Sequence, residues 1–446
     1  ILGPTPTLFY PGQPGSPYAN VSYTDPSLWN GAEPRKAFSF DWYRNHAGRI
    51  TTQLGSKNRF NVYGDLQKSC RCTTGPFTGA NAIESERGWD WFPSGVVQGT
   101  WTRPVSSRLL LEAGASWQTA NWVNFAQEGV TQNDRSILET ATNYRYGANA
   151  LLTAPKARTG RSAERVTVSY VTGTHNVKVG VTNEQAFNDE SRSRNNTTDG
   201  LNYDFLNGKP IRLQYYALPF LQQERQNMEL GIFAQDAWKI DRLTVTLGIR
   251  YDRVTMGFPA ASLPAGLFVP AREVSELKGV PTWNDISPRT SVVWDIFGNG
   301  KTAVRAGFNR FMTAQTTGFA RLYAPTALTT QVLPWTDVNG DDIAQGERGC
   351  TYLTAGCEIN FANLPATFGI RALSTPDPDI QRPGQYSINL GVTQEVLGRV
   401  TLTAEWYQNR FTDITERNNV LRNADSYTPV QVVSPLDGST ITVYDV

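Results

Sequence analysis

Oxygen-bearing side chains recur at alternate positions within one acidic stretch, Asp337 to Glu347. Asp337, Asn339 and Asp341 have the spacing with which a calcium loop begins, because Ca²⁺ prefers carboxylate and amide oxygens. The stretch departs from such a loop at Asp342, where a turn glycine is expected, and at Glu347, which stands one position early. The spacing predicts a calcium site in the 337–347 loop, and a solvated acidic turn without metal is the alternative.

Four cysteines form two close pairs along the chain, Cys70 with Cys72 and Cys350 with Cys357. Both pairs fall in long connections of the fold inferred below, and disulfides persist where such connections face an oxidising compartment. We expect Cys350–Cys357 to staple its loop, whereas Cys70–Cys72 encloses a single residue and demands tighter geometry. Crossed pairings, free thiols and a metal pair are the alternatives.

Histidine, the most common residue in acid–base catalysis, is scarce in this chain. The two histidines, His46 and His175, have no acidic or nucleophilic partner at a recognisable spacing. Gly298–Thr302 looks superficially like a phosphate loop, but it lacks the leading glycine and has strand patterns on both sides, so we predict a hairpin turn. The net charge of +1 gives no reason to expect a nucleic-acid partner. We expect no enzymatic activity and no catalytic residues.

Aromatic residues in the long connections are the remaining candidates for ligand contact, namely Trp89, Trp91, Phe92, Tyr215, Tyr216 and Trp335. Exposed rings that stack suit sugars or peptides, so these residues are candidates for a substrate vestibule. Packing between loops is the alternative, and the sequence assigns no ligand-binding residue.

The elements that would position these groups are β-hairpins. In 242–254, apolar residues alternate strictly with Arg, Thr and Gly, and a period of two indicates a strand. Paired runs of this kind, joined by very short turns, recur at 47–68, 94–118, 163–185, 228–254, 287–312 and 385–411. They predict about twelve strands of roughly ten residues, the length that a tilted strand needs to cross a bilayer.

The connections between these hairpins are long, at about 69–93, 119–162, 186–227, 255–286 and 313–384. Alternation of short turns and long loops is typical of an outer-membrane β-barrel, with short periplasmic turns and long extracellular loops. Aromatic residues near strand ends fit the two interfacial girdles of such a barrel. They are Trp101, Trp117, Trp238, Tyr251, Trp294, Phe297, Phe308, Phe311, Tyr386, Trp406 and Phe411. We therefore predict an all-β, antiparallel transmembrane barrel, and a soluble β protein with core aromatics is the alternative.

Several segments resemble TonB-dependent outer-membrane transporters, in particular the Oar-like branch that carries a carboxypeptidase-regulatory-like domain. LGIFAQDAWK at 230–239, followed by RLTVTLGIRYD at 242–252, is similar to one hairpin of that family. ISPR at 286–289, VVWDIFGNGKT at 292–302 and VRAGFNRF at 304–311 resemble a second hairpin. YDFLNGKP at 203–210 is similar to a family loop, and YSINLGVTQE at 386–395 to a later strand.

The resemblance implies a domain organisation. Barrels of this family have about 22 strands, so residues 1–446 would form part of one. No TonB box, plug or regulatory domain is recognisable, and the chain begins at Ile1 without a signal peptide. We expect a fragment of a longer protein that is located in the outer membrane of a Gram-negative bacterium.

The same resemblance implies a function. We expect a transporter or receptor that imports an unidentified substrate, such as an oligosaccharide, a peptide or a metal chelate. Its expected partners are outer-membrane lipid, the TonB complex through the missing N-terminal part, and an extracellular substrate or surface lipoprotein. The alternative is an adhesin or surface-assembly barrel whose extracellular loops bind proteins or glycans.

Overall fold

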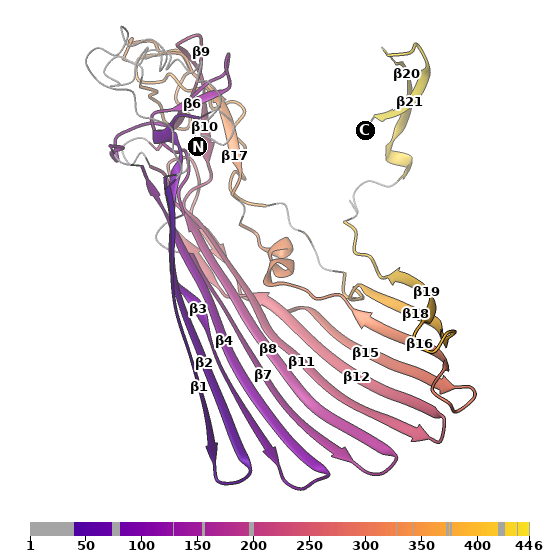
Figure 1. Ribbon diagram of the computed structural model, residues 1–446. Helices are drawn as coiled ribbons and strands as arrows, with labels where there is room; N and C mark the ends of the chain where they lie inside the picture. Colours follow the sequence, from indigo (N-terminus) through magenta and orange to yellow (C-terminus); the bar gives the residue numbers. More distant parts are fainter. Residues whose placement is uncertain are drawn as a thin grey trace.

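One large antiparallel sheet dominates the computed structural model (Figure 1). The structure describes residues 40–445 except 74–80, 128, 154–156, 196–199, 327, 342, 372–373, 375–376, 418–423 and 435. The strands of this barrel sheet are, in spatial order, β1 (Phe40–Leu54), β2 (Asn58–Thr73), β3 (Arg87–Pro104), β4 (Leu109–Ala126), β7 (Ala157–Val171), β8 (His175–Arg192), β11 (Phe220–Ile240), β12 (Leu243–Phe258), β15 (Leu277–Asp295), β16 (Thr302–Met312), β18 (Gly384–Glu395) and β19 (Thr401–Thr412).

The structure confirms all six predicted hairpins, because each strand pairs with its neighbour in sequence order. The turn at 298–300 shows why a phosphate-loop assignment would be wrong. Gly298 and Gly300 have φ values of 71° and 73°, and their N–H groups donate to the Asp295 carboxylate at 2.9 Å. Positive φ favours glycine at tight hairpin turns, so these residues close a hairpin.

The strands are longer than the ten residues expected, from 11 residues in β16 to 21 in β11. Their extra length lies toward the long connections, where the sheet continues beyond the part that a bilayer can cover. Bulges accompany this extension, for example between Gln226 and Met228 of β11, where the register with β12 shifts. Periodicity in the sequence fades at such bulges, and the outer strand ends were therefore assigned to loops.

The two faces of the sheet differ in chemistry. On β12, Leu247 and Ile249 are more than half exposed on one face, which we call the apolar face. Arg250 and Asp252 lie on the other, which we call the polar face. Exposed apolar side chains on a long sheet suit contact with lipid, and the polar face then lines the interior of a barrel.

The aromatic girdle is largely on the apolar face. Trp117, Trp238, Trp294 and Trp406 are between 43% and 50% exposed there. Trp238 and Trp294 lie near the ends of β11 and β15, as expected, whereas Trp117 and Trp406 lie in the middle of β4 and β19. Phe311 and Phe411 differ from the expectation, because their register with Gln385 places them on the polar face. Simple alternation gives the same result, because Phe311 and Phe411 stand an odd number of residues from Phe308 and Trp406 on the apolar face. Position near a strand end was therefore not sufficient to place these two rings in the girdle.

The long connections form a second sheet, which lies above the barrel sheet near β1 to β8 (Figure 1). Its strands are, in order, β17 (Thr330–Pro334), β10 (Lys209–Tyr216), β9 (Asn202–Leu206), β5 (Ile137–Glu139) and β6 (Tyr144–Tyr146). Two small hairpins pair β13 (Ala261–Leu263) with β14 (Arg272–Val274) and β20 (Thr428–Val433) with β21 (Thr440–Asp445). Three short 3₁₀ helices complete the described elements: η2 (Ile83–Ser85), η3 (Thr317–Tyr323) and η4 (Ala424–Ser426).

The barrel sheet is open, with β1 and β19 as its edges at opposite sides of the molecule (Figure 1). Among the described residues, no helix is long and apolar enough to cross a membrane. In a bilayer the unpaired backbone groups of an edge strand have no water to bond. Further strands must therefore pair with β1 and β19 when this sheet is in a membrane.

Candidate functional site

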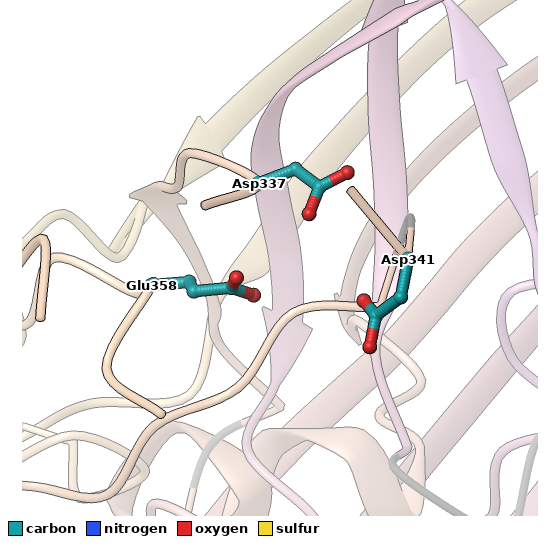
Figure 2. A group of neighbouring side chains, drawn as sticks. All are labelled: Asp337, Asp341 and Glu358. Carbon is teal, nitrogen blue, oxygen red and sulfur yellow. The ribbon is translucent and has the colours of Figure 1, made fainter. Parts of the chain in front are cut away.

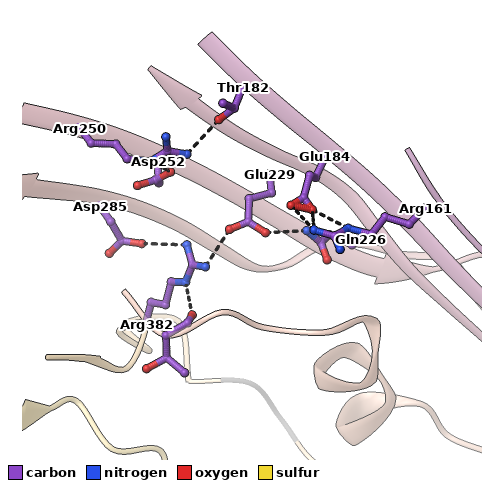
Figure 3. Close-up of polar contacts among 10 residues, drawn as sticks. Arg161, Thr182, Glu184, Gln226, Glu229, Arg250, Asp252, Asp285 and Arg382 are labelled. Atoms are coloured by element: carbon purple, nitrogen blue, oxygen red, sulfur yellow. Dashed lines mark hydrogen bonds and ion pairs between the residues drawn. The ribbon is translucent and has the colours of Figure 1, made fainter. Parts of the chain in front are cut away.

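Ion pairs cover the polar face in its extracellular half, as Figure 3 shows. Arg161 on β7 donates from Nε to Glu184 of β8 at 2.7 Å. Arg250 on β12 donates to Asp252 at 2.7 Å and to the Thr182 hydroxyl at 2.9 Å. The paired charges lie on neighbouring strands or two residues apart on one strand, because residues in register share a face. The wall of the interior is thus charged but locally neutralised.

Arg382 joins this wall to the long loop 313–383. Its guanidinium donates from Nη2 to Glu229 at 2.9 Å, and Nη1 lies 3.8 Å from Asp285 (Figure 3). Its Nε donates to the Thr313 carbonyl at 2.9 Å, so both ends of the loop meet here. The Arg382 side chain is 3% exposed, and a cation so buried needs carboxylate partners.

The start of the same loop is anchored on Glu224 of β11, which is 3% exposed. The Thr317 hydroxyl donates to Glu224 at 2.9 Å, and Arg321 Nε lies 3.7 Å from the same carboxylate. These contacts come from η3, so the loop enters the concave side of the sheet and is held there.

Apolar contacts support η3 at this position. Val254 and Met256 of β12 are fully buried beneath it, together with Trp283 of β15. Phe319 of η3 packs edge-on against Trp283, with ring centroids 5.0 Å apart. The polar face therefore becomes apolar above Asp252, and loop 313–383 narrows the extracellular mouth of the interior.

The small sheet has a hydrophobic core of its own, and we call the sheet and this core the cap. The core residues come from all five long connections, for example Ala82, Ile137, Tyr203, Tyr215, Phe268, Leu333, Trp335 and Ile359. Tyr203 and Trp335 meet edge-on at 5.4 Å, and the Tyr215 hydroxyl accepts a hydrogen bond from Phe268 N at 3.3 Å. For Tyr215 and Trp335 the alternative, packing between loops, is therefore the one that the structure shows, because both rings are buried in the cap interior.

Buried charges fix the turns of the cap. The Glu139 carboxylate accepts hydrogen bonds from the N–H groups of Asn207 and Gly208, each at 2.9 Å. Asn207 and Gly208 have positive φ, as the two central residues of a tight turn require. Outside the strands of the barrel sheet, burial lowers the pKa of Arg272, which donates to the carbonyls of Pro219 and Gly369 and remains charged at physiological pH.

Trp89 and Trp91 form the aromatic contact that stays accessible. Their rings are stacked at 5.4 Å and 8°, and the Arg87 guanidinium lies 4.6 Å from the Trp89 ring. The register with Ser69 and Arg71 of β2 places both tryptophans on the polar face, and both are partly exposed. A flat stack of this kind at the extracellular end of the interior wall can contact a sugar or an aromatic ligand.

The acidic stretch contributes Ala344 to the core of the cap, and Figure 2 shows the side chains of Asp337, Asp341 and Glu358. Carboxylate oxygens of Asp337, Asp341 and Glu358 all lie within 4.8 Å of one another. The Asn339 side chain lies against Asp341: its amide donates to the Asp341 carboxylate at 3.0 Å, and its Oδ1 accepts from Asp341 N at 3.0 Å. Glu358 was missed from the sequence, because a bridge between Trp335 and Ile359 brings it back to the loop.

The fit of this group to a calcium ion is partial. Three carboxylates are the oxygen donors that Ca²⁺ prefers. The Glu358 carboxylate already accepts hydrogen bonds from the backbone N–H groups of Val338, Asn339 and Gln345. Asp342 lies outside the described residues, and Glu347 does not join the group. The calcium site remains a prediction.

The cysteines are joined as Cys70–Cys72 and Cys350–Cys357. The first pair lies on β2, where residues two apart share a face, with Cα atoms 5.0 Å apart. The second closes a loop below the acidic stretch, with Cα atoms 5.9 Å apart. Crossed pairing and free thiols are absent from the structure, which describes all four cysteines.

His175 has an acidic partner that its sequence spacing did not reveal. Its Nδ1 lies 2.7 Å from Asp236, and its ring stacks on Trp238 at 5.3 Å. β8 and β11 bring these residues together on the apolar face near the short turns. The pair lies near the short turns, at the opposite end of the sheet from Arg382 and its carboxylate partners.

Comparison with known proteins found similar solved structures and one matching family. The structure is similar to the copper transporter OprC (TM-score 0.47, 10% identity, 84% of this chain and 46% of that chain). It is similar to the alcaligin outer membrane receptor FauA of Bordetella pertussis (0.46, 11%, 91% and 48%). It is also similar to the ferric yersiniabactin uptake receptor FyuA of Yersinia pestis (0.45, 9%, 83% and 46%).

The chain spans about half the length of these solved structures, and no curated protein matches it. A family model described as an outer membrane beta barrel domain matches residues 17–444. This match covers nearly the whole chain, and the open sheet with one apolar and one polar face has the architecture that the model describes. The chain therefore belongs to the outer membrane beta barrel domain family, whose place is the outer membrane of Gram-negative bacteria.

Proposed function

We propose that this chain forms part of the barrel of a TonB-dependent outer-membrane transporter that imports an extracellular solute. The solute would be an oligosaccharide, a peptide or a metal chelate, and the chain itself has no enzymatic role. The observation that carries the proposal is the charged polar face, with Arg161, Glu184, Arg250, Asp252 and Arg382 on or against it. A wall of this kind favours a wide, hydrated interior over one filled by apolar side chains.

The size of the barrel supports the same function. Twelve strands form an arc whose edges, β1 and β19, lie far apart (Figure 1). Closing this arc requires additional strands, and a barrel of about 22 strands encloses a lumen that a plug fills. The Oar-like hairpin segments at 230–252 and 286–311 favour the TonB-dependent class and a regulatory domain elsewhere in the protein.

The cap and loop 313–383 support a role in substrate capture. They lie at the extracellular end, and loop 313–383 is tied to the polar face through Glu224 and Glu229. The partly exposed Trp89–Trp91 stack lies on the same face. Substrate that enters at the cap would meet the stack and the ion pairs before it reaches the plug.

Two measurements in the native host test this function. Cells producing the full protein without its plug should become sensitive to vancomycin, which an intact outer membrane excludes. Cells that lack the gene and cells that lack the TonB complex should both fail to grow on one and the same solute. That solute would be an oligosaccharide, a peptide or a metal chelate, supplied as the sole source of its nutrient. If plug removal leaves vancomycin resistance unchanged, the wide lumen is refuted. If gene loss abolishes only attachment to glycans or proteins, the barrel is an adhesin.

A further inference from the structure

Basic side chains lie on the apolar face at its extracellular end, above the aromatic girdle. On β1 and β2, Arg44 and Lys68 are in register and therefore share this face. The Arg44 guanidinium lies 5.1 Å from the Trp42 ring, and Lys68 Nζ lies 5.9 Å from Trp42 and 5.4 Å from Phe92. Each cation is thus held against a ring at the upper edge of the lipid-facing surface.

A second group repeats this arrangement on β7, β8 and β11. Arg225 lies 5.6 Å from the Phe187 ring, which in turn packs against Trp117 at 6.2 Å. Asp189 binds Arg225 at 2.6 Å and Arg158 at 3.4 Å. One carboxylate therefore faces two guanidiniums, and the Arg158 side chain is 64% exposed.

A third group lies on β16, β18 and β19. Arg310 stands 5.7 Å from the Tyr386 ring, and Tyr386 is in register with Arg410. Phe308 stacks on Tyr386 at 5.8 Å, one step nearer the centre of the sheet. Arg253 of β12, exposed on the same face, lies between the second and third groups.

The opposite end of the apolar face is different. The residues beside Trp238 there are His175 and Asp236, which form an ion pair with no surplus cation when histidine is charged. Arg289 also stacks on a ring, Phe311 at 5.1 Å, but it lies on the polar face. Arg103 of β3 is exposed on the apolar face at this end, but it makes no ring contact within the described part of the chain. Among the described residues, cations that stack on rings and face the lipid therefore lie at the extracellular end.

Cations at this depth meet lipid headgroups, because aromatic rings on the lipid-facing surface gather at the boundary of the hydrocarbon, and the rings here lie beside the cations. Guanidinium groups bind phosphate with two parallel hydrogen bonds, and an ammonium binds it as a point charge. We propose that the three groups are binding sites for the phosphorylated lipid headgroups of the outer leaflet. The Arg158–Asp189–Arg225 group retains a net positive charge for a phosphate, and Asp189 positions both guanidiniums.

The alternative is that these side chains only reach toward water from the membrane edge, without a specific ligand. Equilibrium binding of labelled lipopolysaccharide to the detergent-solubilised full protein distinguishes the two. Each cation near an anionic surface contributes about a fivefold gain in affinity. We therefore expect Arg44→Gln with Lys68→Gln, or Arg158→Gln with Arg225→Gln, to weaken binding about 25-fold.

The matched control is Arg289→Gln, which removes a ring-stacked cation from the polar face and should leave lipid binding unchanged. A second arm needs no mutation and so does not depend on folding of the variants. The wild-type protein should bind phosphatase-treated lipopolysaccharide far more weakly than untreated lipopolysaccharide. Equal binding of both lipids, or equal weakening by Arg289→Gln and by the double variants, would overturn the proposal.

Discussion

Arg382 offers the sharpest test of how loop 313–383 is held. Replacing it with methionine keeps most of the side-chain volume and removes the charge. Glu229 and Asp285 then face each other across a buried wall without their cation. We expect the end of the loop to open far more often, while the barrel strands remain paired.

The magnitude follows from the contacts. Hydrogen bonds to charged groups contribute about 1.5–3 kcal/mol each, and removal of one partner from a buried pair costs about 3–5 kcal/mol. Glu229 is 21% exposed, which weakens its share, and Asp285 lies 3.8 Å away. We therefore expect Arg382→Met to lower the free energy of loop opening by about 3 kcal/mol, which increases the equilibrium constant for opening roughly 150-fold.

Hydrogen exchange followed by mass spectrometry measures this opening directly. Peptides covering 377–383 should exchange roughly 100-fold faster in Arg382→Met, whereas peptides of β11 should keep their protection. Arg348→Ala is the matched control, because Arg348 lies in the same loop, is exposed and donates to the Pro365 carbonyl.

A second variant separates charge from packing. Adding Glu229→Gln and Asp285→Asn to Arg382→Met removes the stranded carboxylates, and part of the protection should return. The proposed clamp is refuted if Arg382→Met and Arg348→Ala give the same exchange at 377–383. It is also refuted if the triple variant opens more than the single one.

Three further predictions concern the cap and its loops. Leu213 of β10 is fully buried in the cap core, so Leu213→Ala should destabilise the cap by about 2–5 kcal/mol, visible as faster exchange in the cap with unchanged gel mobility of the unboiled barrel. If the 337–347 loop binds calcium, chelator should lower the melting temperature of the wild type and leave that of Glu358→Gln unaffected. Identical melting curves of the wild type with and without chelator would refute the calcium site. Replacing Cys350 and Cys357 by serine should cost about 2 kcal/mol of local stability, because the closed loop is short, and thermolysin cleavage of that loop should accelerate. Cleavage at the wild-type rate would show that the staple adds no local stability.

Local periodicity was sufficient to predict the barrel sheet. At 228–254, alternation fixed both strands and their turn, and the structure pairs Leu230 with Arg253 and Ile240 with Leu243 in the expected hairpin. The paired residues there are close in sequence, so the alternation of apolar and polar residues on both sides of the turn is enough to predict the hairpin. The strand ends were missed where bulges and cap contacts replace simple alternation.

The cap could not be predicted in this way. β5 and β6 have three residues each, too few for any period to be recognised, and β5 pairs with β9 in parallel. Trp335 looked accessible in the sequence because nothing local indicates that Tyr203 covers it. Glu358 likewise joins Asp337 only because the chain doubles back.

The cap also couples distant parts of the chain to one another. Its sheet is complete only when β17 has paired with β10, and the two strands come from different long connections. The hydrogen bond from Ala344 N to the Tyr203 hydroxyl likewise joins residues 141 positions apart. Because its core takes residues from all five long connections, a displacement of one hairpin from its neighbours would disturb the same small core. The cap therefore makes the extracellular ends of the hairpins depend on one another in addition to the pairing of their strands.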